Sequence, residues 1–482
     1  MERNSDTIVA IATAPGRGGI GVVRLSGAEA MEIAAPMLRL REPMEAGRAR
    51  FGYLLDGAEQ GFDGAGGEAG GVLDEVVVTY FAGPRSYTGE DVVEMAAHGS
   101  PVLLEAMVRG CVERGARLAE PGEFTQRAFL SGRLDLTQAE AVNDLIQSTT
   151  LHQARLAASQ MGGAVSREVS PTKDRLLGLM ATLEAGIDFA EDDIDVLPGE
   201  AILERLAEVR APLESLARSY AYGRVVRDGF RLAIVGRPNA GKSSLFNALV
   251  EREEAIVTSA PGTTRDPVRE TIALGGVPVE LIDTAGLRGG AGGEGMLDEA
   301  EVLGIARSRQ AMADADVVLL VIDGTTELCA EDVEVLEESG TGRGRLLVVL
   351  NKSDLFGGMP EGVEGAKAAL AGISRSGRVQ VVETSTRSGA GVGELRAAVL
   401  ELVRGGGVTR EGGLLTNLRQ HGAVTEALGA LAEARAAVEG GLPHEVLLLD
   451  LHRGLRALDR LTGMTTTEDV LRLIFSSFCI GK

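Results

Sequence analysis

The segment that most restricts the fold of this chain is a glycine-rich loop, Gly236-Arg-Pro-Asn-Ala-Gly-Lys-Ser243. It follows a short apolar run, Leu232 to Val235, and precedes a run typical of a helix, Ser244 to Leu249. A strand, such a loop and a helix together form a P-loop, in which backbone N–H groups surround phosphates at the positive end of the helix. We expect Lys242 to neutralise the β- and γ-phosphates and the Ser243 hydroxyl to ligate magnesium. The alternative is a glycine-rich turn that binds no ligand.

Short apolar runs recur through residues 230–404, and segments of helical character separate them. The further runs are Val279 to Ile282, Val317 to Ile322, Leu346 to Leu350 and Val379 to Val382. Strands that alternate with helices form a parallel sheet covered on both faces. We therefore predict a P-loop α/β domain with a mostly parallel sheet at residues 230–404.

The rest of the 482-residue chain divides into an α+β segment, 1–120, and two helical segments, 121–229 and 405–482. The α/β domain is therefore expected to be inserted into one discontinuous helical domain. In residues 1–120 the strand-like runs are Thr7 to Ala14, Ile20 to Leu25 and Glu75 to Phe81, and the helix-like run is Ala28 to Leu38. The apolar stripes expected to face a helix-bundle core are Ala139, Val142 and Ile146, and Leu176, Met180, Leu183 and Ile187.

Two glycine-rich segments lie within residues 1–120. Gly57 to Gly71 is predicted to be a surface loop. Gly16-Arg-Gly-Gly-Ile-Gly21 matches the dinucleotide fingerprint, but that fingerprint requires a helix after the loop, whereas Ile20 to Leu25 is strand-like. We interpret it as a tight turn between two strands.

A second polar motif, Asn351-Lys-Ser-Asp354, follows the run Leu346 to Leu350 and indicates which base is bound. A carboxylate at Asp354 can accept from both N1–H and the 2-amino group of guanine. Adenine has neither donor there, so the carboxylate would lose its partners. Ser385-Thr-Arg387 follows the last strand and is expected to contact the guanine O6.

The third set of motifs concerns magnesium and the γ-phosphate. Asp283-Thr-Ala-Gly286 ends the run Val279 to Ile282, where a carboxylate can hold magnesium and a glycine N–H can sense the γ-phosphate. Thr263 or Thr264 could supply a second hydroxyl ligand. Many GTPases place Gln after Asp-x-x-Gly to orient water. Leu287 stands there in this chain, so the group that activates water must come from elsewhere.

Composition restricts the partners and the compartment. The chain has 48 Lys and Arg against 70 Asp and Glu, a net charge of −22, so an RNA partner would need a local basic patch or a second protein. Cys111, Cys329 and Cys479 are scattered and odd in number, which favours a reducing cytosol. No apolar run approaches the ~20 residues needed to span a bilayer, and the N-terminus has no export signal. We expect a cytoplasmic protein.

Over essentially its whole length the chain resembles the MnmE (TrmE) family of tRNA-modification GTPases. The matching segments are Asp6 to Ala10, Pro15 to Gly21, Tyr87 to Asp91, Pro121 to Phe129, Leu134 to Ala141, the motifs above and Phe478-Cys-Ile-Gly-Lys482. The resemblance implies an N-terminal tetrahydrofolate-binding domain that forms a homodimer, a helical domain and an inserted GTPase domain. It also implies a flavoprotein partner, MnmG (GidA), which carries FAD. Together such proteins modify carbon 5 of the wobble uridine in certain tRNAs.

The resemblance also assigns residues outside the P-loop. Arg24, Glu94, Arg133 and Lys482 match folate contacts, for a 5-formyl or methylene tetrahydrofolate, since a carboxylate suits pterin N–H donors and cations suit the glutamate tail. The alternative for each is a solvated surface charge. Cys479 matches a cysteine proposed to lie near the modification chemistry, the alternative being a free thiol packed in a helix.

For hydrolysis, Glu301 matches a glutamate that orients or activates water, the alternative being an exposed helix carboxylate. Potassium ligands match at Asn239, Thr258, Ala260 and Thr263, where a cation would offset charge in the transition state. The full GTP-binding set is Asn239, Ala240, Gly241, Lys242, Ser243, Ser244, Thr258, Ser259, Ala260, Pro261, Gly262, Thr263, Thr264, Asp283, Thr284, Ala285, Gly286, Asn351, Lys352, Ser353, Asp354, Ser385, Thr386 and Arg387, with Ser243 and Thr264 on magnesium.

Two other functions use the same motifs. A ribosome-assembly GTPase would carry a basic RNA-binding module beside the GTPase domain, and no such basic stretch is visible. A folate-responsive regulator would use the GTPase only as a switch, without tRNA chemistry. Modification of tRNA nucleosides separates these alternatives.

Overall fold

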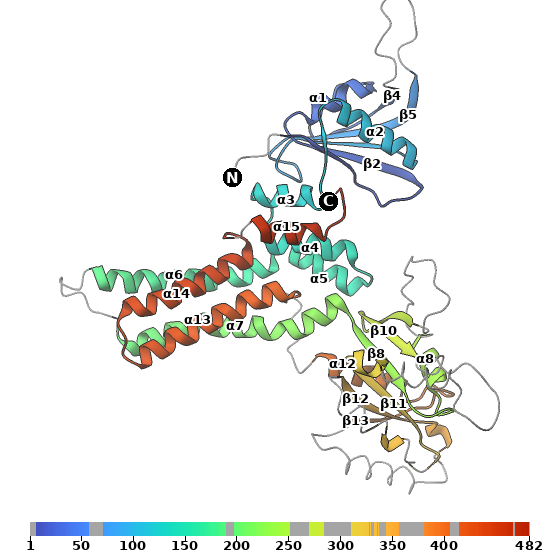
Figure 1. Cartoon of the computed structure of the whole chain (residues 1–482), viewed down its shortest axis with the longest axis vertical. Helices are drawn as coiled ribbons and strands as arrows, with labels where there is room; N and C mark the ends of the chain where they lie inside the picture. Colours follow the sequence, from blue (N-terminus) through green and yellow to red (C-terminus); the bar gives the residue numbers. More distant parts are fainter. Residues whose placement is uncertain are drawn as a thin grey trace, which may run out of the picture. The chain divides into compact units, whose positions relative to one another are not determined.

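The structure is a computed structural model of the whole chain (Figure 1). It describes residues 6–56, 71–188, 197–250, 269–283, 310–326, 328, 332–334, 336, 344–355, 380–404, 414–465 and 468–481. The chain forms two compact units: Met1–Asn143 with Asp459–Lys482, and Asp144–Leu458. Each unit is described separately below.

The first unit contains a seven-stranded sheet in the order β3-β4-β5-β6-β2-β1-β7. All its neighbouring strands are antiparallel except β1 and β7. The strands are β1 (Ile8–Ile11), β2 (Gly18–Ser26), β3 (Leu38–Leu40), β4 (Ala49–Leu55), β5 (Val72–Phe81), β6 (Val92–Gly99) and β7 (Arg117–Leu118). The predicted connection between two antiparallel strands is confirmed, since β1 pairs with β2, but it lies at residues 12–17 and Gly18 to Gly21 already belong to β2. Of the glycine-rich segment 57–71, only Gly71 is among the described residues.

Helices cover one face of this sheet. They are α1 (Ala30–Ala34), the 3₁₀ turn η1 (Ala35–Met37) and α2 (Pro101–Glu113). In α2, Leu104, Met107 and Cys111 have helical spacing and are buried against alternate residues of the strands. Gly21 allows this approach, because a Cβ there would lie 2.5 Å from a methyl carbon of Leu104. Ala28 to Leu38 was expected to be one helix, but Leu38 already begins β3.

Three further helices of the chain contribute to the first unit, namely α3 (Glu123–Leu130), α4 (Leu136–Gln147) and α15 (Glu468–Ser476). Leu136 and Ala139 pack with Phe475 and Phe478 in one buried cluster. The first predicted apolar stripe, on α4, is therefore buried at Ala139 and Val142, but the prediction is wrong at Ile146, which is 42% exposed. Apolar periodicity identifies the buried face of a helix, but it does not show where along the helix the packing partners end.

The helical segments of the second unit form α5 (Leu151–Met161), α6 (Ala164–Asp188), α7 (Gly199–Asp228), α13 (Leu418–Glu439) and α14 (His444–Thr462). The division between the two units falls within α4 and α14. The second stripe is confirmed at Leu176, Met180 and Leu183, which are buried, while Ile187 is half-buried. Thr150 begins α5 with a capping box, in which its hydroxyl accepts from the backbone of Gln153 and Gln153 accepts in return.

The second unit also contains a six-stranded sheet in the order β13-β12-β11-β8-β10-β9. Its strands are β8 (Phe230–Val235), β9 (Arg269–Leu274), β10 (Val277–Asp283), β11 (Val317–Asp323), β12 (Arg345–Asn351) and β13 (Gln380–Glu383). Only β9 is antiparallel to its neighbour. Alternate residues of β11 belong to separate buried clusters, so both faces of the sheet are covered. The prediction of a mostly parallel α/β sheet is confirmed.

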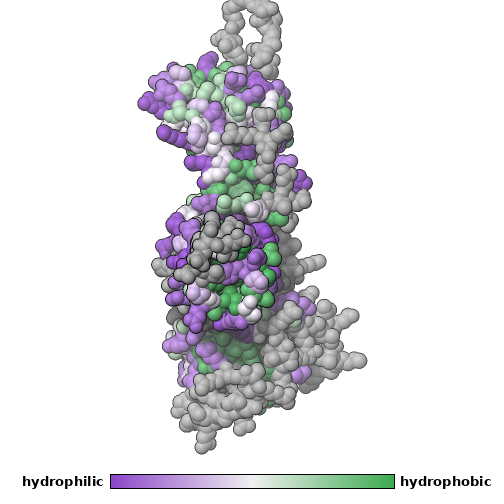
Figure 2. All heavy atoms as spheres, turned by 90° about the vertical axis from the view of Figure 1, so that its left-hand side faces the viewer, coloured by the Kyte–Doolittle hydropathy of each residue, from purple (hydrophilic) through white to green (hydrophobic). Residues whose placement is uncertain are grey.

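The helices beside this sheet include α8 (Lys242–Val250) and α12 (Val392–Arg404), and the 3₁₀ turn η2 (Ser353–Leu355) follows β12 (Figure 1). Strand β8 lies between β10 and β11, so the strand order reverses at the strand that leads into the P-loop. Ligands of open α/β sheets bind at such reversals, at the carboxyl ends of the strands. None of the described helices is long and apolar enough to cross a membrane. The face shown in Figure 2 intersperses hydrophilic and hydrophobic side chains over the described residues.

Candidate functional site

The P-loop connects β8 to α8 and approaches two neighbouring strands closely. Gly236 has a φ of 142°, and a Cβ there would lie 2.2 Å from the carbonyl oxygen of Val321 on β11. Gly241 has a φ of 97°, and its Cβ would lie 2.0 Å from Nδ2 of Asn351 on β12. Both glycines are therefore required by close packing as well as by backbone conformation.

Lys242 begins α8 and is only 7% exposed. Its ammonium donates to the carbonyl oxygen of Arg237 at 2.6 Å, within the same loop. Ser243 and Ser244 are exposed in the first turn of the helix, and Asn239 is exposed with a φ of 63°. The loop thus presents polar side chains to solvent at a helix N-terminus, where the local field favours anions.

Asn351 connects the P-loop to the predicted base-recognition motif. It is buried, its Nδ2 donates to the carbonyl oxygen of Ala240 at 3.0 Å, and its Oδ1 accepts from the Thr384 hydroxyl at 3.3 Å. The backbone N–H of Ser353 donates to the carbonyl oxygen of Thr384 at 3.0 Å. One buried side chain therefore holds three segments that are distant in the sequence.

Asp354 is exposed and accepts from the hydroxyl of the buried Ser385 at 2.7 Å. Thr386 is half-buried and Arg387 is exposed. The structure thus brings Asp354 and Ser385 together, as expected if both contact one base. Lys352 has a φ of 66° and forms an ion pair with Asp323, at 2.5 Å between Nζ and Oδ2.

Several predicted residues fall outside the described part of the chain. They are Thr258 to Thr264, Thr284 to Gly286, Glu301 and Lys482. Asp283 is described only as the last residue of β10, with its backbone. The described site consists of the P-loop, the Asn351 to Asp354 motif and the Ser385 to Arg387 loop.

The sequence reasoning missed the groups that support this site. Arg237 of the P-loop donates through Nε to the buried Asp332 at 2.9 Å, and through its second terminal nitrogen to the Thr326 hydroxyl at 3.1 Å. Asp323 is the last residue of β11, and a polar residue at the carboxyl end of a parallel strand is the signal that could have identified it.

The predicted folate residues lie in the first unit. Arg24 on β2 and Glu94 on β6 are paired in register, and both Nε and a terminal nitrogen of Arg24 lie 2.8 Å from one Glu94 oxygen. Their side chains are only 15% and 29% exposed, so the alternative of a solvated surface charge is wrong for these two residues. The guanidinium carbon of Arg24 lies 5.7 Å from the ring centroids of both Tyr87 and Phe124.

The C-terminal segment lies beside Arg24. The carbonyl oxygen of Gly481 accepts from Arg24 at 3.3 Å, and a Cβ on Gly481 would lie 2.3 Å from the carbonyl oxygen of Ile11. Cys479 is exposed and lies after the end of α15, so the alternative of a thiol packed in a helix is wrong. Arg133 is exposed and lies beside Gly89.

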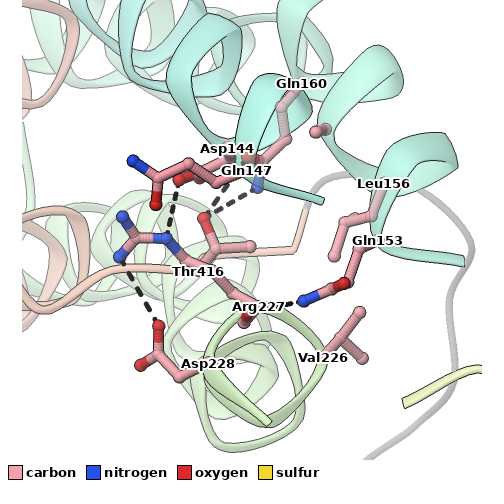
Figure 3. Close-up of a pocket in the computed structure, with 10 residues that line it drawn as sticks. Asp144, Gln147, Gln153, Leu156, Gln160, Val226, Arg227, Asp228 and Thr416 are labelled. Atoms are coloured by element: carbon pink, nitrogen blue, oxygen red, sulfur yellow. Dashed lines mark hydrogen bonds and ion pairs between the residues drawn. The ribbon is translucent and has the colours of Figure 1, made fainter. Parts of the chain in front are cut away.

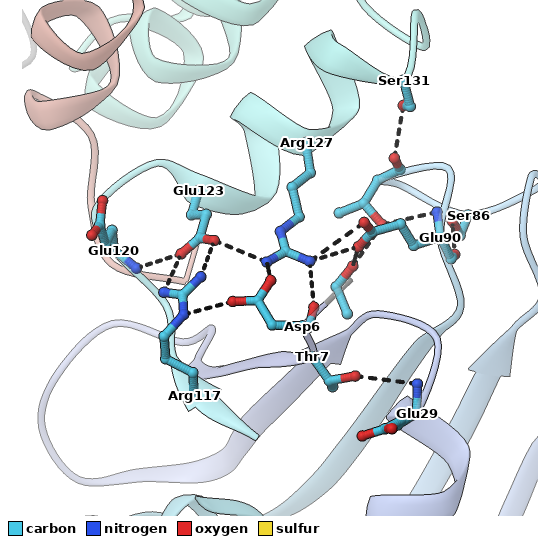
Figure 4. A network of polar contacts seen from close by, with 12 residues as sticks. Asp6, Thr7, Glu29, Ser86, Glu90, Arg117, Glu120, Glu123, Arg127 and Ser131 are labelled. Carbon is cyan, nitrogen blue, oxygen red and sulfur yellow. Dashed lines mark hydrogen bonds and ion pairs between the residues drawn. The ribbon is translucent and has the colours of Figure 1, made fainter. Parts of the chain in front are cut away.

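An ionic network centred on the buried pair Arg127 and Glu123 joins several segments of the first unit (Figure 4). Arg127 of α3 is 6% exposed and contacts Asp6, Glu90 and Glu123 at 2.8, 3.1 and 3.0 Å. Arg117 adds contacts to Asp6 and Glu123 at 2.8 and 2.7 Å. Burial opposes ionisation of Glu123, but hydrogen bonds from Arg117, Glu120 N–H and Arg127 outweigh it and lower its pKa. This network was not predicted.

A polar cavity of about 300 Å³ lies in the second unit, near the end of α7 (Figure 3). Its lining includes an ion pair between Arg227 and Asp144 at 2.8 Å, and Gln153 donates to the carbonyl oxygen of Arg227 at 2.7 Å. None of the predicted site residues lines it. It is therefore separate from the nucleotide and folate sites predicted from sequence.

Comparisons with known proteins agree in every part of the chain. The "GTP-binding protein TrmE N-terminus" family matches residues 7–133, and the "MnmE helical domain" family matches residues 136–479. A "tRNA modification GTPase MnmE" of Koribacter versatilis is 54% identical over 480 residues, covering 99% of both chains. Proteins described in the same words from Roseiflexus and Synechococcus are 40% and 41% identical over at least 99% of each chain.

Among solved structures, Era of Aquifex aeolicus bound to GDP and aluminium fluoride is 24% identical. The match covers 42% of this chain and 66% of the Era chain, with a TM-score of 0.29.

Proposed function

The chain belongs to the MnmE family of tRNA modification GTPases, and from this premise we propose that it hydrolyses GTP and acts in the modification of tRNA. The observation that carries the proposal is the connection made by Asn351, which joins the P-loop to the segments that hold Asp354 and Ser385. A phosphate-binding loop and a guanine-reading carboxylate are thereby held in one site.

For the nucleotide, we propose that Asn239 to Ser244 surround the phosphates and that Asp354 reads guanine, with Ser385 to Arg387 beside it. Magnesium would be held by Ser243 and Thr264, with Asp283 in support. An exposed hydroxyl on the first turn of α8 and a carboxylate residue at the end of β10 suit an oxygen-preferring cation. Bound magnesium would supply charge neutralisation between the β- and γ-phosphates.

For hydrolysis, the proposal includes Glu301 as the group that orients water, in the place that Leu287 cannot fill. Potassium would bind Asn239 with Thr258, Ala260 and Thr263. The exposed amide of Asn239 on the P-loop is compatible with such a ligand. The remaining contacts to nucleotide would come from Ser259, Pro261, Gly262 and Thr284 to Gly286.

For the tRNA chemistry, we propose that a tetrahydrofolate derivative binds beside Arg24 and Glu94, and that the cations Arg133 and Lys482 suit its anionic tail. The Glu94 carboxylate is paired with Arg24, whose guanidinium lies near two aromatic rings, and such a set suits a pterin, which offers N–H donors and a flat face. Cys479, exposed in the neighbouring segment, is proposed to lie near the chemistry. The reaction modifies carbon 5 of the wobble uridine together with MnmG, which supplies FAD.

The homodimer is proposed to form through residues 1–120. In the sequence, the helical segments 121–229 and 405–482 flank the proposed GTPase domain, residues 230–404. A row of apolar side chains crosses the sheet face opposite α2, at Phe51, Val77, Ala96 and Val22 on four neighbouring strands. Phe51 and Val77 are exposed, and the row adjoins Arg24 and Glu94. Exposed apolar rows of this kind are typical of interfaces. We place the assembly in the cytoplasm.

Mass spectrometry of tRNA nucleosides from a deletion strain tests the proposed function. We expect the carbon-5 modification of the wobble uridine to disappear and to return with the wild-type gene. An Asp354→Asn gene should restore it poorly. Full modification in the deletion strain would contradict the proposal and favour a regulatory GTPase.

A further inference from the structure

The carboxylate of Asp323 is fully engaged at the edge of the nucleotide site. Asp323 ends β11 and is paired in register with Asn351 of β12. Oδ2 accepts from Nζ of Lys352 at 2.5 Å, and Oδ1 accepts from the backbone N–H and the hydroxyl of Thr325 at 3.0 and 2.6 Å. The Asp323 side chain is 16% exposed. Three hydrogen-bond donors therefore fix the orientation of the Asp323 carboxylate.

The backbone of Lys352 has an uncommon conformation. Its φ of 66° lies in the left-handed region, which residues with a Cβ seldom adopt. Neighbouring hydrogen bonds hold it there: Gly324 N–H donates to the carbonyl oxygen of Asn351 at 3.0 Å, and Leu355 N–H donates to that of Lys352 at 2.9 Å. Such residues persist where the surroundings fix them, and they cluster at ligand sites.

The turn that begins at Asp323 also contacts the P-loop. Thr326 N–H donates to the carbonyl oxygen of Asp323 at 3.2 Å, and the Thr326 hydroxyl accepts from Arg237 at 3.1 Å. The turn Asp323–Thr326 therefore joins the phosphate-binding loop to the base-recognition motif by contacts separate from those of the Asn351 side chain.

We propose that Asp323 is a positioning residue for the nucleoside: it anchors the ammonium of Lys352 so that the methylene stem of Lys352 forms a fixed wall beside the base read by Asp354. The proposal rests on the proposed GTP site. A free lysine side chain has many rotamers, and ordering it on binding costs affinity. Lysine stems cover apolar surface while the ammonium stays in a polar contact. The anchor orders the side chain before the nucleotide arrives.

Asp323 is ionised in its contact with Lys352. Burial opposes ionisation of Asp323, but hydrogen bonds from Lys352 and Thr325 outweigh it, so the pKa of Asp323 lies below its ordinary value. The carboxylate is charged at neutral pH. An Asp323→Asn variant therefore removes the charge while it keeps an acceptor for Thr325.

The test uses the full-length chain and displacement of a fluorescent GDP analogue by GDP and by GTP. We expect Asp323→Asn to raise both dissociation constants by about three- to tenfold and by the same factor, because the contact is to the nucleoside. Lys352→Met should have a similar effect, and the double variant should lose little more. In hydrolysis assays the loss should fall mainly on KM rather than on kcat.

The control is a second ion pair in the same sheet, between Arg231 of β8 and Glu280 of β10 at 3.0 Å, with both side chains partly exposed. Glu280→Gln should leave both dissociation constants within about twofold. Circular dichroism and saturation at higher nucleotide concentration separate weaker binding from misfolding.

Three results would overturn the proposal: wild-type affinity in Asp323→Asn, a loss for GTP without a loss for GDP, or effects of Asp323→Asn and Lys352→Met that multiply. If the wild-type chain itself bound neither GDP nor GTP, the proposed function would fail first and this inference with it.

Discussion

The strongest stability prediction concerns Arg127, the centre of the ionic network in the first unit. Arg127→Met keeps much of the side-chain volume and removes the cation that contacts Asp6, Glu90 and Glu123. The Arg127 side chain is 6% exposed and Glu123 is 7% exposed, so solvent cannot take the place of this contact, whereas Asp6 and Glu90 are 40% and 30% exposed and water can reach them. Among the described residues, Nε of Arg127 has no hydrogen-bond partner. Removing one partner of a buried ion pair costs about 3–5 kcal/mol. Arg117 remains beside Asp6 and Glu123, so we expect the lower end, about 3 kcal/mol.

Hydrogen exchange of the full-length chain measures this effect locally, which matters because a chain of several domains does not unfold in one step. Peptides from β1 and α3 should exchange roughly 100-fold faster in Arg127→Met, since 1.4 kcal/mol is a factor of ten. The matched control is Arg48→Met, whose partner Glu45 lies at 3.2 Å on the exposed surface of the same unit. It should change exchange by less than about fivefold.

The pH dependence checks the same reasoning. The pKa values of Asp6 and Glu123 are lowered because hydrogen bonds from Arg117 and the charge of Arg127 outweigh burial. A lowered folded-state pKa gives stability that is complete above the unfolded value and is lost as pH falls through the folded value, here below roughly pH 4. Arg127→Met should reduce that loss. Exchange in β1 and α3 within threefold of wild type would refute the reasoning.

Three further predictions concern ligands. Asp354→Asn should weaken GTP by roughly 2 kcal/mol and relieve the penalty against xanthosine triphosphate, measured by calorimetry, and unchanged GTP affinity would mean that Asp354 does not read the base. Replacing sodium with potassium should raise kcat about tenfold, or about 1.4 kcal/mol, while Glu301→Ala should lower kcat with little change in nucleotide affinity. Equal rates in both salts together with an active Glu301→Ala enzyme would contradict that mechanism. Ala at Arg24 or Glu94 should weaken a reduced folate by calorimetry and leave GTP binding unchanged, and loss of both ligands would indicate misfolding.

The second-unit sheet was predictable because both of its faces are buried, which makes strands such as β11 apolar at every position from Val317 to Ile322. The strand β9, Arg269–Leu274, was missed because it carries Arg269 and Glu270 and forms the antiparallel edge. In the first unit, β4 and β6 were missed because strands with one covered face do not form continuous apolar runs: buried positions alternate with more exposed ones along each strand.

The site was predictable where polar residues follow a strand directly, as Asn351 to Asp354 follow β12. The contacts that assemble it were not. Asn351 and Ala240 are 111 residues apart, and no local pattern indicates that one amide will join them. Likewise, Arg24 and Glu94 came from family resemblance alone, because the register of β2 on β6 cannot be read from either strand by itself.

The contact between Arg24 and Gly481 has a consequence for biosynthesis. Gly481 leaves the ribosome 457 residues after Arg24, which is roughly 20–90 s at ~5–20 residues per second. During that time Phe475 and Phe478, which pack on Leu136, are also absent. The apolar surface that they cover in the folded protein is then exposed and open to chaperone binding. A stop codon or a bulky fusion near residue 475 should therefore damage the domain that was translated first.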